Sequence, residues 1–374
     1  MGIEFEFFKA GNGDSILVST YDEDDDGEKE YKTHILIDGG HKSLYTRKLR
    51  NLKDNLSKLD LVIMTHLDTD HILGLRDLLQ EDVNKIIKDE KYNPFIKEIW
   101  FNSFNQTSND GDKIFYNPFE SDNASIIHQI QFNELLAIAN NKNKKINYKD
   151  YISVDNISTL TIGEIEIILL SPNDKKLEEL YKKYKKPLDS QNLSGSSYAS
   201  DSDYSIKDLA KEPFDKSGDD SVANGSSIAF ILVYKDNKGI EQNYLFLADA
   251  HIDLINEELE KHTELFNDNG KIEFEFIKLS HHGSKFNINE DFLNFVETDN
   301  YVILTDTENH YHPDKETLSK IIVHHKINNK DKANFIFNYS AGAKEKRYDF
   351  TKQDIELYQD YFELIYSEKY PMEL

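Results

Sequence analysis

The sequence of 374 residues contains no cysteine. This absence excludes disulfide bonds, thiolate ligands to a metal and a cysteine nucleophile, although it does not decide the cellular compartment. No apolar run approaches the ~20 residues needed to cross a membrane. The first residues, Met1–Glu6, lack the basic and apolar regions of a secretion signal. We therefore expect a soluble, cytoplasmic protein.

Basic residues are also in short supply. The chain has 44 Lys and Arg against 69 Asp and Glu, a formal net charge of −25. A negative field of this size opposes non-specific nucleic-acid binding, so the composition argues against a high-affinity DNA-binding protein that acts alone. It does not exclude a nuclease, because bound metal ions and a local basic patch can reverse the potential at a site.

The densest group of chemically active side chains lies between an apolar run at 59–63 and a helix-like run at 72–79. The first run predicts a buried strand and the second a helix. Loops at such places often carry chemistry in α/β proteins. The loop holds two histidines and two aspartates, at His66, Asp68, Asp70 and His71.

Imidazole nitrogens and carboxylate oxygens together suit divalent ions such as Zn²⁺, Mn²⁺ and Fe²⁺. The alternative is a polar surface turn in which Asp70 caps the helix. Four potential ligands in six residues favour the metal site, because capping needs only one of them. Two later strands, at 244–248 and 274–279, also end in potential ligands, Asp249 and the pair His281-His282.

The turn His66-x-Asp68-x-Asp70-His71 resembles the signature of metallo-β-lactamase-fold hydrolases, normally His-x-His-x-Asp-His, with Asp68 in place of the second His. This variant is similar to that of the hydrolase domain attached to the DNA-uptake channel of natural competence, and of its stand-alone relatives. Other segments match in the same order. They are Gly13–Val18 with Ile35–Gly40 (opening hairpin), Tyr244–Asp249 (fourth motif), and Ser280–Ser284 (fifth motif).

The resemblance covers most of residues 3 to 340. It implies one four-layer αββα sandwich over residues 1–374, with two β-sheets face to face and helices outside. Insertions are expected near 103–150 and 173–222. Within the second, residues 188–220 lack periodicity and predict a long loop, for which a lid over the site is one interpretation. The preceding basic stretch at 175–186 predicts a solvated helix, with a nucleic-acid contact as the weaker alternative. An acidic hairpin loop is predicted over 21–30, and a terminal helix over 354–366.

The family pattern is not complete. No His follows Trp100 at the place of the third motif, and Ala248 replaces the usual Gly before Asp249. His128 falls in a predicted helix over 123–139 and is interpreted as a surface or packing residue.

The resemblance implies a site with two divalent ions. It places His66 and Asp68 on one ion, Asp70, His71 and His282 on the other, and Asp249 between them. His281 is also expected close by, and the sequence does not decide between the two histidines. Asp38 would support the ligands from behind. Because Asp68 makes the cage richer in oxygen, Mn²⁺ is favoured over Zn²⁺ relative to the all-His pattern.

Further residues are candidates for catalysis or substrate binding. Asp70 and His312 are the catalytic candidates, His312 as a general acid or, alternatively, as part of a helix-start turn. Asn224 and Ser226 could orient a phosphate or a ligand, or they could bond their own backbone. Ser284 and Lys285 could contact a phosphate.

Three functions are compatible with these residues. The first is a phosphodiesterase, most simply a nuclease that acts on nucleic acid or a nucleotide. The second is hydrolysis of a small acyl compound such as a lactone or thioester, and the third is a weakly catalytic partner subunit. A nuclease could serve DNA metabolism or phage defence with an activating protein partner, and the sequence does not distinguish these roles.

Overall fold

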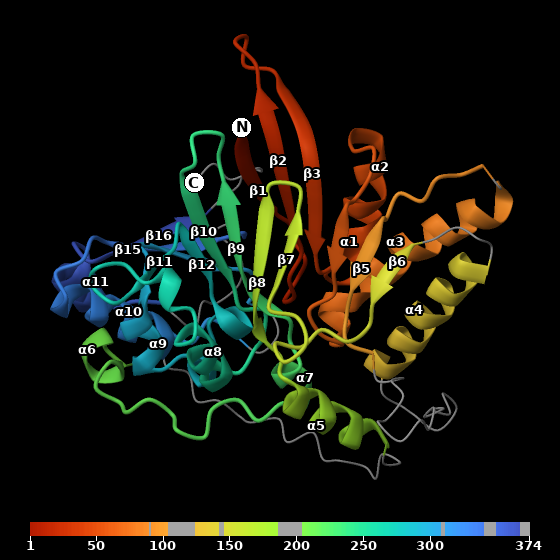
Figure 1. The fold of residues 1–374 in the computed structure, drawn as a ribbon. Coiled ribbons are helices and arrows are strands. Elements are labelled where there is room, and N and C mark those ends of the chain that lie inside the picture. The colour runs from red at the N-terminus through yellow and green to blue at the C-terminus, as the bar shows by residue number, and fades with distance from the viewer. Residues whose placement is uncertain are drawn as a thin grey trace.

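The structure is a computed structural model. It describes residues 1–89, 91–103, 124–141, 146–185, 204–307, 311–339 and 349–366. Two β-sheets stand face to face in the middle of the molecule, and helices cover the outer face of each (Figure 1). The described residues thus form the αββα sandwich that the sequence predicts.

The first sheet has the strand order β1-β2-β3-β4-β5-β6. Its first three strands are antiparallel, and β3 to β6 run parallel. Parallel neighbours need crossover connections, and the helices between them provide these. The strands are β1 (Gly2–Phe7), β2 (Ile16–Glu23), β3 (Lys29–Ile37), β4 (Leu61–Ile63), β5 (Glu98–Trp100) and β6 (Asn147–Lys149).

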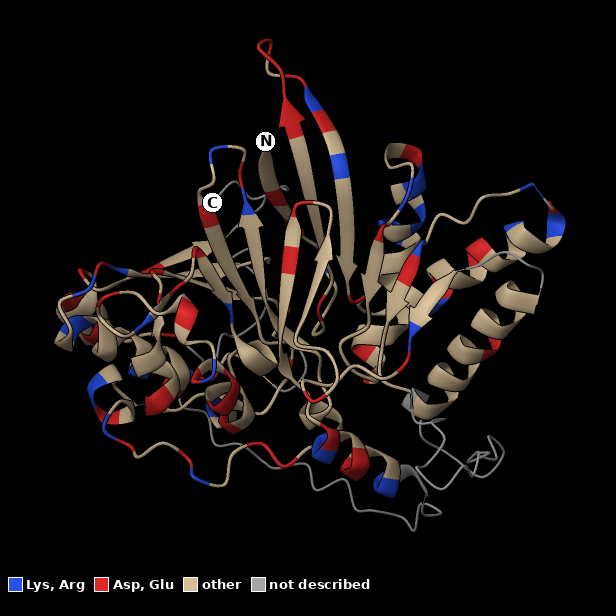
Figure 2. Ribbon diagram, in the orientation of Figure 1, with Lys and Arg blue, Asp and Glu red and all other residues tan. Residues whose placement is uncertain are grey.

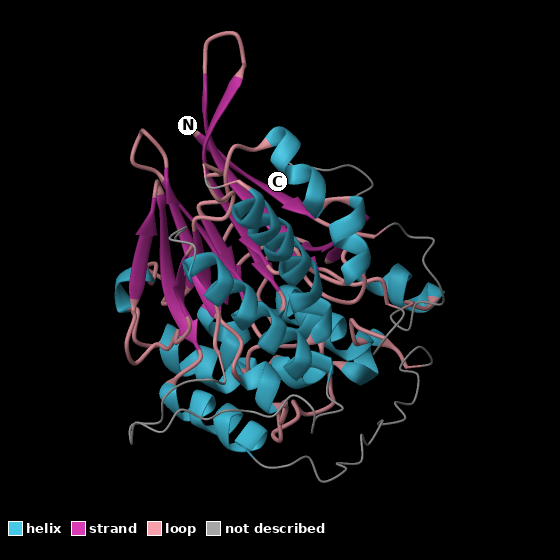
Figure 3. Cartoon of the chain, turned by 90° about the vertical axis from the view of Figure 1, so that its right-hand side faces the viewer, coloured by secondary structure: helices cyan, strands magenta, loops and turns pink. Residues whose placement is uncertain are grey.

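Helices cover the outer face of this sheet, as Figure 3 shows from their side. The long helix α3 buries Ile72, Leu75 and Leu79 at helical spacing against Leu36 and Val62 of the sheet. Together they form an apolar layer outside the first sheet. The helices are α1 (Lys42–Arg47), α2 (Leu52–Asn55), α3 (Thr69–Lys88) and α4 (Ala124–Asn141), with a short 3-10 turn at Leu49–Asn51.

The second sheet has the order β16-β15-β14-β12-β10-β9-β8-β7. Strands β7 to β10 are antiparallel, and the strands from β10 to β16 run parallel. They are β7 (Thr159–Ile162), β8 (Ile165–Ser171), β9 (Ala229–Lys235), β10 (Glu241–Phe246), β12 (Phe276–Lys278), β14 (Asn300–Ile303), β15 (Ala333–Phe337) and β16 (Phe362–Tyr366). A separate pair consists of β11 (Ile272–Glu273) and β13 (Val296–Glu297).

The helices of the second half pack against the outer face of the second sheet or near the end of the sandwich that carries the site. They are α5 (Asp174–Lys185), α6 (Ile206–Leu209), α7 (Val222–Gly225), α8 (Ile252–Leu259), α9 (Glu290–Phe295), α10 (Lys315–Ile327) and α11 (Lys352–Tyr358), with 3-10 turns at Thr263–Leu265, Ser280–Gly283 and Lys285–Asn287.

A third apolar cluster lies between the two sheets. Phe5, Ile35 and Trp100 of the first sheet meet Phe230 and Phe276 of the second, and all five are buried. Phe5 and Phe276 pack edge to face with ring centroids 4.9 Å apart. Each such side chain contributes about 1.5–3 kcal/mol by burial. This core fixes the strand ends of the two sheets relative to one another.

The chain differs from the sequence-based expectation at two places. The acidic loop expected over 21–30 is shorter, because β2 runs to Glu23 and β3 begins at Lys29. The terminal helix expected over 354–366 is wrong in its second half, where Phe362–Tyr366 forms the edge strand β16 beside β15. The strand edge that β15 offers decides in favour of β structure there.

The two predicted insertions lie only partly in the described ranges. Helix α4 and strand β6 account for the described part of 103–150 and belong to the first two layers. In 173–222 the structure describes α5, α6 and an extended segment that leads into α7. The first half of the predicted loop, residues 188–203, lies outside the described residues. Asp and Glu are spread over both halves and over the tip of the β2–β3 hairpin (Figure 2). None of the described helices is both long enough and apolar enough for a membrane crossing.

Candidate metal centre

The candidate ligands lie at one end of the sandwich because they follow parallel strands. Asp38 follows β3, the turn Thr65–His71 follows β4, Asp249 follows β10, and the turn Ser280–Gly283 follows β12. Carboxyl ends of parallel strands meet at the same edge of a sheet, where open α/β sheets place their ligands. The two facing sheets therefore bring the predicted residues of both halves together.

In the first half, Asp38 holds the turn that carries His66 and His71. Its carboxylate accepts hydrogen bonds from the Thr65 backbone N–H (2.8 Å) and hydroxyl (2.7 Å), and it contacts His71 Nδ1 at 2.8 Å. The Thr65 hydroxyl lies 3.1 Å from His66 Nδ1. Both rings are thus held at Nδ1, which leaves Nε2 for the cluster.

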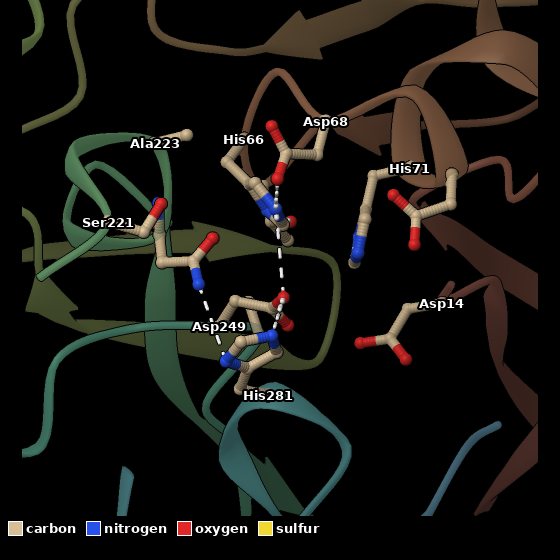
Figure 4. Close-up of polar contacts among 12 residues, drawn as sticks. Asp14, His66, Asp68, His71, Ser221, Ala223, Asp249 and His281 are labelled. Atoms are coloured by element: carbon tan, nitrogen blue, oxygen red, sulfur yellow. Dashed lines mark hydrogen bonds and ion pairs between the residues drawn. The ribbon is translucent and has the colours of Figure 1, made fainter. Parts of the chain in front are cut away.

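Asp249 lies at the centre of the cluster (Figure 4). Its Oδ2 is 3.8 Å from His66 Nε2 and 3.9 Å from His281 Nε2, and its Oδ1 is 3.9 Å from His282 Nε2. Asp68 Oδ2 also lies 3.8 Å from His66 Nε2. The two oxygens of one carboxylate therefore face different imidazoles.

The second-half turn has an unusual backbone. His281 and His282 both have positive φ, 45° and 54°, a conformation that costs about 1–3 kcal/mol for residues other than Gly and clusters at functional sites. Gly283 follows at φ 88°, and a Cβ there would lie 2.7 Å from the Cβ of Pro313. The chain thus packs tightly behind the two histidines.

The donor atoms fit divalent ions. His66 Nε2, His71 Nε2 and Asp249 Oδ1 are buried and have no hydrogen-bond partner, which is costly unless something else satisfies them. Two atoms that share one ion, each about 2.0–2.2 Å from it, lie roughly 3–4 Å apart. Sets of three donor atoms lie within 4.8 Å of one another in His66–His71–Asp249, Asp70–His71–His282 and Asp14–Asp249–His282.

Charge is concentrated at the same place. Burial opposes ionisation of Asp249, but His282, His281 and other histidines outweigh it and hold the pKa of its carboxyl well below the usual value. Burial and Asp70 raise the pKa of Asp68 to about 6. Burial and His71 lower the pKa of His66 to about 3, which leaves the neutral ring that a metal ligand requires.

The acidic surroundings also act on His281. Burial disfavours its charged form, but Asp249 and Asp219 outweigh burial and raise its pKa to about 9. The negative field that stabilises the protonated imidazole of His281 also attracts metal cations. Six carboxylates create this field: Asp14, Asp38, Asp68, Asp70, Asp219 and Asp249.

Among the predicted substrate-binding residues, Asn224 reaches the ligand cluster, whereas Ser226 and Ser284 make local hydrogen bonds. The Asn224 side chain reaches the cluster, with Nδ2 2.7 Å from Asp219 Oδ2 and 3.4 Å from His281 Nδ1. The Ser226 hydroxyl instead donates to the Ala223 carbonyl at 2.7 Å, the local bond that was the alternative interpretation. The Ser284 hydroxyl caps the following 3-10 turn by accepting from the Phe286 N–H.

Lys285 and His312 lie beside the histidine turn. Lys285 Nζ is 3.3 Å from Glu316 Oε2. The ring of His312 packs against that of His281 with centroids 4.9 Å apart, and its Nδ1 lies 3.7 Å from Asp314 Oδ2. Asp314 precedes α10 as its N-cap residue. His312 therefore lies at the cluster and at a helix start, so both interpretations of its place are compatible.

Sequence reasoning missed three residues. Asp14, in the β1–β2 turn, places Oδ1 3.5 Å from His282 Nδ1. Lys278 pairs with Asp14 and is 1% exposed. Asp219 places Oδ2 3.3 Å from His281 Nδ1. A lysine inside an apolar strand was a usable signal for Lys278, whereas Asp219 lies in a segment whose sequence shows no periodicity.

Two other histidines have separate tasks. His128 of α4 bonds Arg76 of α3 at 2.8 Å, away from the ligands, as the packing interpretation predicts. His251 contacts the Ser221 carbonyl through Nε2 and Lys176 Nζ through Nδ1, both at 2.9 Å. It thereby ties the segment before α7 to α8.

Comparison with known proteins gives a family match for part of the chain. Residues 29–137, which span β3 to α4 and include the His66–His71 turn, match the model of the Metallo-beta-lactamase superfamily. The match covers less than a third of the chain, and it indicates that these residues belong to a metallo-beta-lactamase superfamily domain. The members of that superfamily are metal-dependent hydrolases. Among curated proteins, none matches the sequence significantly.

Solved structures with detectable similarity are distant. The metallo-beta-lactamase fold protein YhfI from Bacillus subtilis is 10% identical (TM-score 0.39), covering 98% of this chain and 96% of its own. A diphosphatase from the PhnP family is 10% identical (TM-score 0.36; 96% and 85% covered). The metallo-beta-lactamase MIM-1 from Novosphingobium pentaromativorans is 10% identical (TM-score 0.29; 73% and 74% covered).

Proposed function

We propose that the metallo-beta-lactamase superfamily domain of this chain is a metal-dependent phosphodiesterase whose substrate is a nucleic acid or a nucleotide. The observation that carries this proposal is the position of Asp249, whose two oxygens face His66 and His281 on one side and His282 on the other. A carboxylate so placed can bridge two ions. Two ions about 3.5–4 Å apart are a recurrent arrangement for displacement at phosphorus.

The chain offers ligands for both ions. His66 and Asp68 would hold one, and Asp70 and His71 the other, with Asp249 between them and the histidine turn completing the set. When bound, such ions lower the pKa of a water molecule and offset negative charge on the substrate oxygen. The oxygen-rich donor set favours Mn²⁺ over Zn²⁺ relative to an all-imidazole set.

Residues around the ligands have their own roles in the proposal. Asp38 and Thr65 orient the two imidazoles of the first half. His312, packed against His281, is positioned to donate a proton to the leaving oxygen. Asn224 and Lys285 flank the histidine turn and supply polar groups for a phosphate.

The choice of a nuclease rests on the resemblance of two segments, the His66–His71 turn and His281-His282-Gly283-Ser284, to competence-type hydrolases. The net charge of −25 is the observation that favours the second candidate, hydrolysis of a small neutral acyl compound. A nucleic acid must approach against that charge, and its binding should therefore require the ions.

The test is hydrolysis of bis(p-nitrophenyl) phosphate, single- and double-stranded DNA and RNA, and a p-nitrophenyl ester. Mn²⁺, Zn²⁺, Mg²⁺ and EDTA are compared for the wild type, Asp70→Ala and His282→Ala. The matched control is Asp82→Asn. Asp82 is also a fully buried carboxylate, but it lies on α3. It accepts hydrogen bonds from Tyr92, Phe95 and Ile96 and is not one of the candidate ligands.

We expect metal-dependent cleavage of the phosphodiesters that both ligand variants lose and Asp82→Asn keeps. Faster cleavage of the ester than of every phosphodiester would favour the acyl hydrolase. No hydrolysis of any substrate by protein that holds stoichiometric metal would contradict both candidates.

A further inference from the structure

The turn Ser280–Gly283 presents two neighbouring histidines to opposite oxygens of one carboxylate. His281 Nε2 lies 3.9 Å from Asp249 Oδ2, and His282 Nε2 lies 3.9 Å from Asp249 Oδ1. We propose that this turn supplies one histidine to each of two metal positions, and that Asp219 and Asp14 are the carboxylates that hold the two rings in place. The inference rests on the metal site of the proposed function and names residues that determine its occupancy.

The first position is the one that lacks the family's third-motif His. Asp249 Oδ2 is shared between His66 Nε2 at 3.8 Å and His281 Nε2 at 3.9 Å, and Asp68 Oδ2 lies on the other side of His66 Nε2 (Figure 4). His281 thus gives this position a second imidazole from a different part of the chain. With His281, the first position has nitrogen donors from His66 and His281 and oxygen donors from Asp68 and Asp249.

The second position is formed around the other oxygen of Asp249. One donor atom each of Asp70, His71 and His282 lies within 4.8 Å of the others, and Asp249 Oδ1 faces His282. Each position therefore takes one His and one Asp from the His66–His71 turn and one His from the second-half turn. The bridging carboxylate serves both.

Asp219 holds the ring of His281. Its Oδ2 lies 3.3 Å from His281 Nδ1 and accepts bonds from Asn224 Nδ2 (2.7 Å) and Asn287 Nδ2 (3.2 Å). Its Oδ1 accepts from the Ser221 N–H at 2.9 Å. A carboxylate fixed by three donors holds the imidazole at Nδ1, which directs the Nε2 lone pair toward the ion.

Asp14 faces the ring of His282 at ion-pair distance, with no hydrogen bond between the two facing atoms. Its Oδ1 lies 3.5 Å from His282 Nδ1, and its other oxygen pairs with Lys278. Lys278 Nζ also donates to the Ala248 carbonyl at 3.1 Å, one residue before Asp249. Lys278 and Asp14 are 1% and 2% exposed, so the pair links the bridging residue to the His282 ring inside the protein.

The pairing of Asp14 with Lys278 follows from burial. A carboxylate among so many others would be expensive to bury without a cation, and removing one member of a buried pair costs about 3–5 kcal/mol. Asp14 and Lys278 are therefore positioning residues. Their effect on metal binding must be separated from their effect on folding.

The experiment measures Mn²⁺ and Zn²⁺ stoichiometry by mass spectrometry, and the two binding steps by calorimetry, without substrate. We expect two ions in the wild type and one in each of His281→Ala and His282→Ala. Asp219→Asn should weaken one step about 10–100-fold and Asp14→Asn the other. Asp82→Asn, a buried carboxylate away from the ligands, should leave both steps unchanged.

A further variant separates folding from positioning. Asp14→Asn/Lys278→Met removes both members of the buried pair and should regain urea stability relative to Asp14→Asn while the weakened step stays weak. Recovery of metal affinity together with stability would show a structural role only and overturn the assignment of Asp14. Two ions in His281→Ala, or the same step weakened by Asp219→Asn and Asp14→Asn, would overturn the proposal.

These outcomes are independent of the reaction. Two ions divided as described, without phosphodiester hydrolysis, would contradict the proposed function and leave this inference intact. A single ion in the wild type would contradict the inference, even if that protein hydrolysed phosphodiesters.

Discussion

The two ligand-bearing turns are built by different means. The turn Thr65–His71 carries four candidate ligands close together in sequence, and Asp38 of the neighbouring strand holds it. The turn Ser280–Gly283 carries two histidines in left-handed conformations. The carboxylates at their Nδ1 atoms come from distant parts of the chain, Asp14 and Asp219.

The difference shows where the two halves depend on each other. The first turn is held by hydrogen bonds within its own sheet, whereas the second is contacted by Asp14 of the β1–β2 turn and by Asp219 of the segment before α7. A change in the first half can therefore reach His282 through Asp14 without touching any ligand. Asp249 faces both turns, so a substitution of Asp249 should affect both of them at once.

The largest effect is expected for Asp249→Ala, which removes the carboxylate between the two turns. Loss of charge stabilisation worth several kcal/mol corresponds to a fall of about 10³-fold or more in kcat/KM. The measurement is Mn²⁺-dependent hydrolysis of bis(p-nitrophenyl) phosphate together with metal content. More than a tenth of wild-type activity with full metal content would contradict a bridging role.

A smaller effect is expected for Asp38→Asn, which weakens the support of the first turn only. The amide cannot accept at both oxygens, so the contacts of Thr65 and His71 cannot all be kept. We expect metal affinity to fall about 10–100-fold, measured by calorimetry. The control Asp82→Asn should lose stability without losing metal; an equal loss of metal in both variants would mean that Asp38 acts only through folding.

The tight packing behind the second turn gives a prediction for stability. Gly283→Ala places a Cβ against Pro313 at positive φ and should cost about 3 kcal/mol of unfolding free energy. Gly270→Ala has φ 71° but open space around it and should cost about 1 kcal/mol. Urea denaturation measures both, and equal costs would show that Pro313 yields easily.

The smallest effect is expected for Lys285→Ala, at the edge of the second turn. Its partly exposed pair with Glu316 contributes about 0–1 kcal/mol to stability. We expect a KM for the phosphodiester raised about 2–5-fold with kcat unchanged. Lys261→Ala, which removes a more exposed pair with Glu258, is the control; the same KM in both variants would remove Lys285 from the substrate site.

The sequence predicts the local parts of this molecule well. The strands before His66, Asp249 and His281 are short apolar runs, the helix after His71 has apolar residues at helical spacing, and the structure forms all of them. Asp14 and Asp219 could not be found in the same way, because their roles exist only once the two sheets face each other. The error at Phe362–Tyr366 has the same cause, since β15 offers that segment a strand partner that no local pattern reveals.

The proposed function depends most on two ions around Asp249. The direct measurement is anomalous diffraction from crystals grown with Mn²⁺, recorded on both sides of the manganese absorption edge. We predict two peaks about 3.5–4 Å apart, one between His66 and His281 and one between His71 and His282, with Asp249 touching both. No peak at Asp249, or a single peak bound only by the His66–His71 turn, would contradict the proposed function.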